Sequence, residues 1–384
     1  MSNKLATIEK IISIKEIPNK DRIVCAKVRG WDCIVKKDEF KKEDLCIFIE
    51  PDTIIFKRFV DDDCTTDEKI RLRTIKMGGQ ISQGLVLSLN DHPEYFSKCT
   101  DWDGYIYADT DEVYKWNKDT DDCLAVVEGD NITELLKVEK YEKPIPVQLR
   151  GTIKGKFPSF LRKTDEVNIQ SEPELLEQLK GKPYYITQKV DGTSGTFYKW
   201  KGKFGVCSRN LEMKDPRENP QEKVKYLWDS IKRFLGLSKQ RNKVNPRTFS
   251  LNVYWQAAEK YKIKERLPED YAIQGEICGP RIQGNKMGLK EIEMFIFNVW
   301  DINKQKYLLP SLIPLDNTDV LRELKFVYLL DTEEKFNYSI EELLEKAKGD
   351  YSNGTPQEGI VVRSIDQIIS FKVRNPEFML KYGE

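Results

Sequence analysis

A lysine and an aspartate lie beside a glycine-rich turn in the segment YYITQKVDGTSGTF, residues 184–197. Lys189 follows an apolar run, and Asp191 comes two residues later. A lysine in this position either points into solvent at the end of a strand or acts as a nucleophile toward a nucleotide. The tetrapeptide KVDG alone favours the solvated lysine, so the choice depends on the residues that the rest of the chain contributes.

Several residues suited to nucleotide chemistry follow Lys189 in order along the chain. Arg209, next to Asn210 in CSRNLEM, carries a planar guanidinium that suits a phosphate or a ribose. Glu276 lies in the middle of the apolar segment YAIQGEICG, where an unpaired carboxylate is costly and a metal ion or a cation would relieve the cost. Glu358 begins a further apolar strand, EGIVVR.

Two more predicted strands carry paired side chains at alternate positions, which places each pair on one strand face. Phe295 and Phe297 in MFIFNVWD favour either a surface on which a base stacks or ordinary core packing. Lys372 and Arg374 in SFKVRN point either into a site or into solvent from an edge strand. Each feature alone favours its structural interpretation, but the ordered set indicates a nucleotide-binding site.

The composition excludes several classes of chemistry. The chain of 384 residues has 63 basic and 63 acidic residues, so nucleic acid would be attracted by local clusters of charge and not by a net charge. One histidine and eight cysteines without a CxxC pair argue against a zinc site, a disulfide framework and histidine-based catalysis. We expect reduced thiols and a cytoplasmic protein, with the nucleus or a host cytoplasm as alternatives. No apolar run approaches membrane-spanning length.

The length favours two domains. Residues 4–90 contain short strands typical of a small antiparallel barrel, and an acidic, aromatic insertion covers about 91–123. A short helix and a proline-containing linker are expected within 129–149, so we place the domains at residues 1–140 and 141–384. The second domain mixes strands with helices predicted at 171–180, 251–263 and 339–349. Ser171 and Glu174 predict a capping box for the first of these helices.

Two basic segments have open interpretations. RLRTIK, which precedes a glycine-rich loop, is either one arm of a β-hairpin or the edge of a groove that contacts RNA phosphates through Arg71, Arg73 and Lys76. The segment 223–247, which includes Lys232 and Arg233, is either a solvated helix and loop or an RNA-backbone contact.

The order KxDG, Arg-Asn, strand glutamate, aromatic strand, EGxVV and FKxR resembles the six motifs of the covalent nucleotidyltransferases, the superfamily of ligases and capping enzymes. Segments outside the motifs, among them RGWDCIVKKDEF and GKFPSFLRKTDE, are similar to ATP-dependent RNA ligases with an N-terminal OB domain, the group that includes the Deinococcus and Naegleria RNA ligases. The resemblance covers nearly the whole chain except the acidic insertion.

This resemblance implies an α+β protein: an N-terminal OB-like β-barrel followed by a nucleotidyltransferase (ATP-grasp-like ligase adenylylation) domain with antiparallel sheets. It implies an ATP-dependent RNA ligase that seals 3′-OH and 5′-phosphate ends through a lysyl-AMP and an adenylylated RNA 5′ end. The cofactors would be ATP and Mg²⁺ or Mn²⁺. The partner would be RNA, in a nicked or splinted duplex, bound by a monomer.

The resemblance also assigns roles to residues. Lys189 would be the nucleophile, and burial beside Lys372 and Arg374 would lower its pKa. Carboxylates suited to Mg²⁺ are Asp191, Glu276 and Glu358. The residues expected to bind ATP are Gln188, Arg209, Asn210, Glu276, Phe295, Phe297, Glu358, Lys372 and Arg374. Those expected to bind RNA are Arg71, Arg73, Lys76, Lys232 and Arg233.

The chain departs from its relatives at three positions: Asn168 stands where an arginine is frequent, Gln188 where glutamate is frequent, and Arg374 where lysine is common. The amide oxygen of Gln188 would accept a hydrogen bond from adenine. A GTP-dependent mRNA-capping guanylyltransferase is an alternative, although its OB domain normally follows the catalytic domain. An OB-fold RNA-binding protein with a decayed catalytic domain is another; Asn168 supports it, and the intact motif lysines and carboxylates oppose it.

Overall fold

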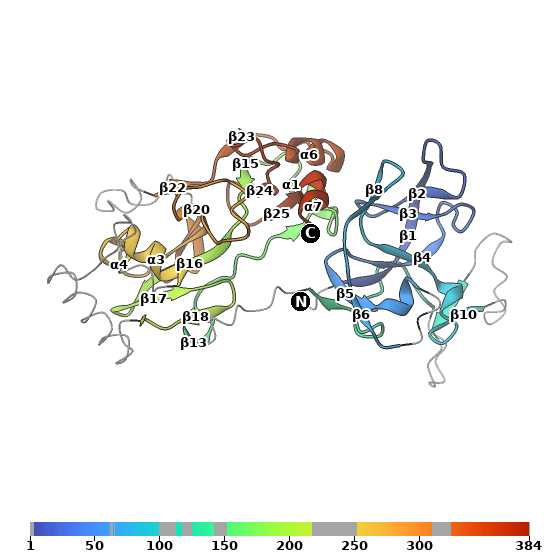
Figure 1. Ribbon diagram of the computed structural model, residues 1–384, viewed down its shortest axis with the longest axis horizontal. Helices are drawn as coiled ribbons and strands as arrows, with labels where there is room; N and C mark the ends of the chain where they lie inside the picture. The colour runs from blue at the N-terminus through green and yellow to red at the C-terminus, as the bar shows by residue number, and fades with distance from the viewer. Residues whose placement is uncertain are drawn as a thin grey trace, which may run out of the picture.

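The computed structural model describes residues 4–61, 64, 66–99, 113–116, 125–141, 152–216, 252–308 and 324–383. They form two lobes along the long axis of the molecule, an all-β lobe from the first part of the chain and a mixed lobe from the rest (Figure 1). None of the helices in these ranges is long and apolar enough to cross a membrane.

The first lobe is built on a five-stranded antiparallel sheet in the order β3-β2-β1-β4-β9. Alternating apolar residues bury both sides of this sheet: Ile8 and Ile47 belong to one apolar cluster, Trp31 and Phe48 to another. The strands are β1 (Ala6–Glu16), β2 (Ile23–Val28), β3 (Trp31–Lys36), β4 (Leu45–Ile49) and β9 (Leu85–Ser88).

Smaller antiparallel units complete this lobe. Residues 71–76 do not form one continuous strand, because β6 ends at Leu72 and a separate hairpin begins at Ile75. The three-stranded sheet β12-β5-β6 consists of β12 (Glu139–Lys140), β5 (Thr53–Phe56) and β6 (Lys69–Leu72). The two hairpins are β7 (Ile75–Met77) with β8 (Gln80–Ser82), and β10 (Phe96–Cys99) with β11 (Val113–Trp116). Short 3₁₀ helices lie at Lys57–Phe59 and Leu89–Asp91.

The short helix predicted within 129–149 is wrong for the described part of that range, residues 129–141. Residues 133–137 form turns, and β12 then pairs with β5. The hydroxyl of Thr133 accepts hydrogen bonds from the backbone N–H groups of Leu5 and Ala6 at 2.9 and 3.0 Å. The segment is thereby fastened to the start of β1, and this tertiary contact overrides its weak helical pattern.

The second lobe contains a large sheet in the order β13-β18-β17-β16-β19-β20-β21, with β22 parallel to β20 and all other neighbours antiparallel. An apolar cluster covers one face of this sheet, where Tyr254 and Trp255 of a helix pack against Ile273 and Ile277. The strands are β13 (Ile153–Lys156), β18 (Leu211–Met213), β17 (Lys203–Cys207), β16 (Thr193–Trp200), β19 (Tyr271–Cys278), β20 (Glu293–Asp301), β21 (Lys306–Leu308) and β22 (Lys325–Phe326).

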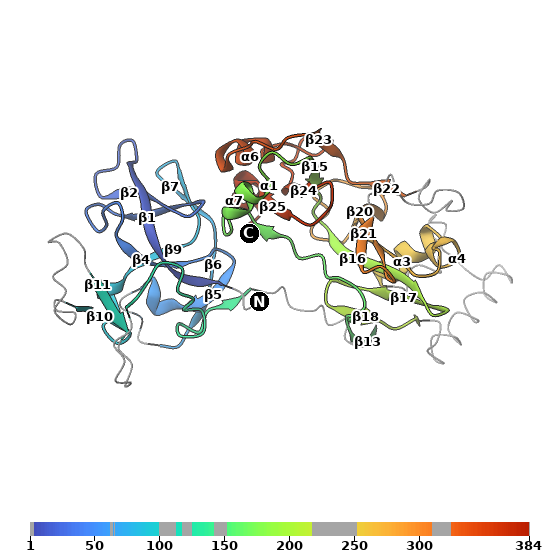
Figure 2. The same ribbon diagram turned by 180° about the vertical axis from the view of Figure 1, so that it is seen from behind.

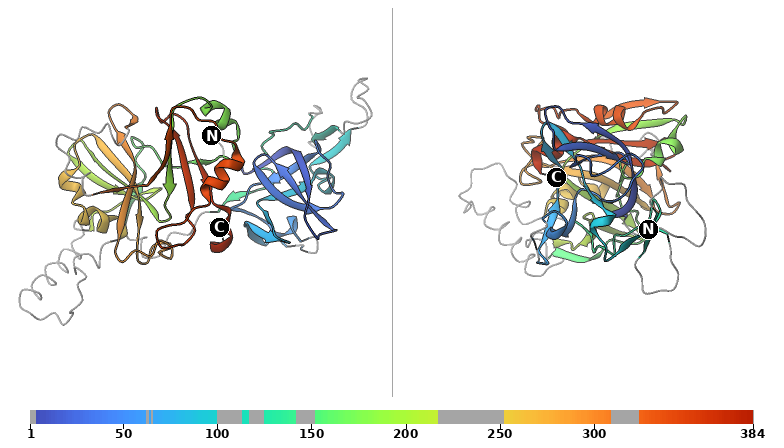
Figure 3. Two further views of the ribbon diagram at one scale, coloured as in Figure 1. Left: turned by 90° about the horizontal axis from the view of Figure 1, so that it is seen from above. Right: turned by 90° about the vertical axis from the view of Figure 1, so that its right-hand side faces the viewer.

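A smaller sheet in the order β14-β25-β24-β15-β23 lies between the large sheet and the first lobe (Figure 3). Its strands are β14 (Val167–Asn168), β25 (Ser370–Arg374), β24 (Gly359–Ser364), β15 (Tyr184–Lys189) and β23 (Leu329–Glu333). Only β14 pairs in parallel, with β25. Residues 190–192 join β15 to β16, so the KVDG segment links the two sheets.

The helices of the second lobe are α1 (Glu174–Leu179), α3 (Val253–Lys260), α4 (Ile263–Arg266), α6 (Ile340–Ala347) and α7 (Pro376–Tyr382). The helices predicted at 251–263 and 339–349 are present, and Ser339 and Glu342 form a capping box on α6. The capping box predicted for α1 is wrong. Its N-cap residue is Pro173, which makes no side-chain capping bond, because the helix begins three residues after Ser171.

Direct contacts join the small sheet to the first lobe, and the two views in Figures 1 and 2 agree on this arrangement. The backbone N–H of Gly30 donates to the carbonyl of Gln170 at 3.2 Å, and the Gln170 amide returns a bond to the Gly30 carbonyl at 2.9 Å. Arg374 forms an ion pair with Asp52 at 3.2 Å. The boundary near Tyr141 stays a proposal: β12 belongs to the first lobe and β13 to the second.

Candidate active site

The candidate nucleophile stands at the end of a strand in the small sheet. Lys189 is the last residue of β15, and pairing between β15 and β24 sets it opposite Gly359. That register brings the preceding residue, Glu358, beside the lysine, and Lys189 Nζ lies 2.7 Å from Glu358 Oε2. The side chains are 24% and 12% exposed, so Lys189 is not a fully solvated strand-end lysine.

The structure contradicts the lowered pKa expected for Lys189. Burial does lower it, but the carboxylates of Glu358 and Glu276 outweigh burial, and the pKa of Lys189 is raised. The nearby guanidinium of Arg374 is a weaker influence than the two carboxylates. Lys372 shows the expected behaviour instead: burial, with the positive charges of Lys189 and Arg374, lowers its pKa to about 8.

Strand register gathers the cations on one face of the small sheet. Lys189, Gly359 and Arg374 form one row across β15, β24 and β25, and Thr187, Val361 and Lys372 form the next. Residues in register on neighbouring strands share a face. The three cationic side chains therefore share the site face of this sheet. The opposite face carries an apolar cluster of residues at the alternate positions, such as Ile186, Ile360, Val362 and Val373.

Glu276 extends toward the site from the large sheet, where β19 pairs it with Ser194 of β16 and Phe295 of β20. Burial raises the pKa of Glu276 to about 8; the charges of Glu358 and Asp191 raise it further, whereas Lys189 opposes the shift. The sequence argument that a mid-strand carboxylate is costly agrees with this environment.

Asp191, Glu276 and Glu358 stay predicted ligands of Mg²⁺ or of its water shell. Within the described ranges, no three acidic, histidine or cysteine side chains are placed to hold an ion together. Asp191 Oδ2 lies 3.1 Å from Lys286 Nζ, and Glu358 faces Lys189. Each of these two carboxylates is therefore paired with its own lysine.

Lys286 is a residue that the sequence argument missed. Its ammonium lies over the rings of Phe378 and Tyr382 of α7, 4.4 and 4.5 Å from their centroids, while it contacts Asp191. Its side chain is only 10% exposed. Asparagine- and glycine-rich surroundings in IQGNKMG predict a loop, and nothing in that pattern indicates a contact with residue 191.

The role expected for Gln188, in which its amide oxygen accepts a hydrogen bond from adenine, stays a prediction. Successive strand residues point to opposite faces, so Gln188 lies on the face away from Lys189. Its amide nitrogen donates to the side-chain oxygen of Gln357 at 2.6 Å, and Gln357 in turn donates to the carbonyl of Ala347. The amide nitrogen of Gln188 thus connects β15 to α6 through Gln357.

The two aromatic candidates differ because β20 contains an irregularity. Gln274 pairs with Asn298 but Gly275 pairs with Ile296, which leaves Phe297 as an extra residue. Phe295 is 3% exposed and packs against Val190 in an apolar cluster, whereas Phe297 is only partly buried. Of the two, Phe297 retains more ring surface for a ligand to contact.

Three other predicted positions lie at the edge of the site. Arg209 pairs with Asp165 and is half exposed, and the side-chain oxygen of Asn210 accepts a bond from Lys163 at 3.1 Å. Asn168 is opposite Lys372 in the β14–β25 register, and its side-chain oxygen accepts a hydrogen bond from the backbone N–H of Gln170. Asn168 therefore lies next to Lys372 in the small sheet, and its side chain stabilises the turn that follows at residues 169–170.

The basic residues expected to contact RNA from the first lobe divide into two kinds. Arg71 is mostly buried, donates to Asp52 at 2.9 Å through Nε and lies over the Tyr141 ring. Arg73 and Lys76 are exposed. Lys232 and Arg233 lie outside the described residues.

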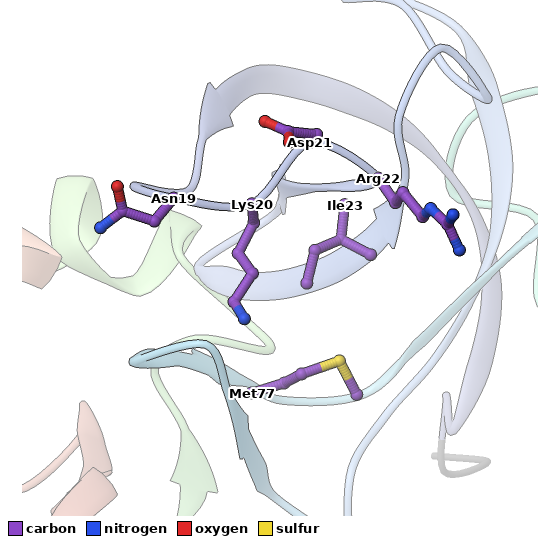
Figure 4. A pocket seen from close by; sticks show the side chains of 6 residues that line it. All are labelled: Asn19, Lys20, Asp21, Arg22, Ile23 and Met77. Carbon is purple, nitrogen blue, oxygen red and sulfur yellow. The ribbon is translucent and has the colours of Figure 1, made fainter.

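A shallow pocket adds two cations to the same side of the first lobe. It is lined by Asn19, Lys20, Asp21, Arg22, Ile23 and Met77 (Figure 4). Lys20 extends toward the β7–β8 hairpin, where Gly78 adopts a φ of +61°, and a Cβ at Gly78 would lie 2.6 Å from the Lys20 side chain. A glycine is required there, and it lets the lysine pack on the hairpin.

Comparison with known proteins agrees with this architecture. A family model described as an OB-fold domain matches residues 5–89, and one described as RNA ligase matches residues 182–382. The solved structure of Naegleria gruberi RNA ligase with PPi is 30% identical, with 98% of each chain covered and a TM-score of 0.72.

Two variants of that ligase, each solved with ATP and Mn, are 29% identical to this chain. One covers 98% of both chains with a TM-score of 0.72, the other 100% of both with 0.73. A search of curated proteins gives no match. The N-terminal OB fold and the antiparallel sheets expected from the sequence are confirmed.

Proposed function

Because the chain belongs to the RNA ligase family, we propose that it joins RNA ends with 3′-OH and 5′-phosphate termini by an ATP-dependent reaction through Lys189. The observation that carries the proposal is the position of Lys189: a strand-end lysine, three-quarters buried, against Glu358 and on the same sheet face as Lys372 and Arg374. The similar ligase structures that contain ATP, AMP or PPi support a nucleotide at this site.

The reaction has three steps. The unprotonated Lys189 Nζ attacks the α-phosphorus of ATP, a P–N bond forms, the bond to the β-phosphate oxygen breaks, and pyrophosphate leaves. The RNA 5′-phosphate then attacks the same phosphorus and breaks the P–N bond, which transfers AMP to the RNA. Finally, a 3′-OH attacks the 5′-phosphate phosphorus and AMP leaves, with the strand sealed. Lys372 and Arg374 offset negative charge on the phosphate as it is transferred.

Because the pKa of Lys189 is raised, the site must promote the loss of a proton from its ammonium. The lysine must lose a proton before it attacks, and the Glu358 carboxylate, which accepts a hydrogen bond from the ammonium, is placed to accept that proton. Glu276 and Glu358, whose charges both act on Lys189, carry the carboxylate oxygens that Mg²⁺ and Mn²⁺ prefer, so these residues would hold such a cation. The cation would supply positive charge to the phosphates.

The proposal is tested by adenylylation with α-labelled ATP and Mg²⁺, followed by denaturation of the protein. We expect label to remain on the polypeptide, to be absent with GTP and to be lost in Lys189→Ala. Lys180→Ala, a change at an exposed lysine, is the matched control and should label normally. Label from GTP would favour the capping reaction, and no label after pretreatment with pyrophosphate to remove bound AMP would reject covalent chemistry.

The RNA ends are tested separately. A nicked duplex with 3′-OH and 5′-phosphate ends should be sealed, whereas one with 3′-phosphate and 5′-OH ends should not react, because neither the nucleophile nor the AMP acceptor is present. We further propose a monomer acting on nicked or splinted duplexes, to be checked by comparing joining rates for nicked, splinted and single-stranded substrates at several protein concentrations.

A further inference from the structure

Tyr351 is a buried tyrosine just behind the nucleophile, and none of the motifs includes it. It follows α6 and is 3% exposed. Its ring belongs to an apolar cluster that contains Val190, the residue between the lysine and aspartate of KVDG, and Phe295 of β20. The packing of the ring fixes the position of the hydroxyl. The hydroxyl lies between Lys189, at the end of β15, and Glu358, the residue just before β24.

The Tyr351 hydroxyl makes three hydrogen bonds. It donates to the backbone carbonyl of Lys189 at 3.1 Å and accepts from the backbone N–H groups of Asp191 at 2.9 Å and Glu358 at 3.1 Å. A phenol has one donor and two acceptor positions, so all of its hydrogen-bonding capacity is used. The three bonded residues include the proposed nucleophile and two proposed active-site carboxylates.

These bonds begin where the strand ladder ends. The last pair between β15 and β24 is Lys189 with Gly359, and beyond it the chains diverge. Gly359 has a φ of +146°, and a Cβ there would lie 2.1 Å from the Val373 carbonyl, so the backbone at this position requires a glycine. Beyond the last strand pair, the Tyr351 hydroxyl thus connects the segment 189–191 to Glu358, although the two are more than 160 residues apart in sequence.

We propose that the Tyr351 hydroxyl is a positioning group for adenylyl transfer, which orients Lys189 Nζ and the Glu358 carboxylate relative to each other for the attack on ATP. The inference rests on the proposed function. The hydroxyl contacts only backbone atoms, so its effect passes through the orientation of Lys189 and Glu358. Small errors in the orientation of a nucleophile reduce reaction rates by orders of magnitude.

The expected signature is a change in rate without a change in nucleotide binding. Tyr351→Phe keeps the ring and its packing and removes the three hydrogen bonds. We expect the single-turnover adenylylation rate at saturating ATP to fall about 10- to 100-fold. The ATP concentration at half-saturation should change less than about twofold, because the three hydrogen bonds of the Tyr351 hydroxyl are all to backbone atoms.

Tyr261→Phe is the matched control. Tyr261 is 5% exposed, donates to Glu293 and accepts a backbone N–H bond from Met294, but it lies on the helix-covered side of the large sheet. Both variants should lose thermal stability to a similar extent, while only Tyr351→Phe should lose rate. An adenylylation rate within twofold of wild type for Tyr351→Phe, or an equal loss in both variants, would overturn the inference.

The outcomes for the two proposals are distinct. If wild type forms the covalent adenylate and Tyr351→Phe forms it equally fast, the positioning role fails and the ligase chemistry stands; if wild type forms none, both fail. Should Tyr351→Phe not fold, hydrogen exchange in wild type provides a second measurement. Strong protection of the Asp191 and Glu358 amides would support the hydrogen bonds, and exchange at the rate of exposed amides would contradict them.

Discussion

Two pairs of cations at alternate strand positions, Lys372 with Arg374 on β25 and Arg71 with Arg73 at the end of β6, look alike in sequence but have different environments. The β25 pair lies on the same sheet face as Lys189, and burial, together with the positive charges of Lys189 and Arg374, lowers the pKa of Lys372 to about 8. The β6 pair is divided, since Arg71 is paired and stacked whereas Arg73 is exposed.

Asp52 connects the two pairs. Its carboxylate accepts from Arg71 through one oxygen and from Arg374 through the other, at 2.9 and 3.2 Å. One member of each pair, Arg71 or Arg374, therefore bonds Asp52 at the contact between lobes. Lys372 shares the site face with Arg374, whereas Arg73 is exposed to solvent. The comparison shows that burial and the nearest carboxylate, more than residue type, decide what a basic side chain contributes.

The largest effect expected from this difference is on catalysis. Lys372→Met should reduce the adenylylation rate about 100- to 1,000-fold, because a cation next to the transferred phosphate acts in a site of low dielectric constant. Arg73→Met, which changes the exposed member of the other pair, should stay within about twofold of wild type. Single-turnover labelling with ATP measures both, and comparable losses in the two variants would remove the distinction between the pairs.

A second comparison concerns stability and pH. The pKa of Glu276 is raised from 4.5 to about 8, so the folded protein holds a proton that the unfolded chain loses across this window, and wild-type stability declines as pH rises through it. Relative to wild type, Glu276→Gln should therefore gain on the order of 1–3 kcal/mol between pH 5 and pH 8.5. Denaturant unfolding in the presence of a chelator measures this difference.

A difference between Glu276→Gln and wild type that stays flat across this pH range would show that burial does not keep Glu276 protonated in the folded protein.

The smallest effect is expected at the exposed cations of the first lobe. Replacing Arg73 and Lys76 together by alanine should reduce the slope of log affinity against log salt by about 1–2, because each phosphate contact releases counterions. RNA affinity should fall only several-fold, and adenylylation by ATP should not change. Lys37→Ala, an exposed lysine elsewhere in the lobe, should leave the slope unchanged; an equal change there would argue against a local RNA surface.

Sequence reasoning reached the strands of the site because it relied on local periodicity. Alternation placed Lys372 and Arg374 on one face, and the structure has them there. The same rule was insufficient for Phe295 and Phe297, because one extra residue in β20 changes the alternation between them. It was also not applied to Gln188, whose position next to Lys189 puts its side chain on the opposite face.

The sequence by itself determined the family, the order along the chain of the strands that carry the motif residues, and the identity of the candidate nucleophile. These depend on residue type and short-range spacing. Only the tertiary structure decided that Lys189 has a raised pKa, that Asp191 is paired with Lys286 and that Tyr351 joins the KVDG segment to Glu358. Each of these depends on distances between residues that lie about 80 to 170 positions apart, and on the loss of water around them. No local pattern encodes either quantity.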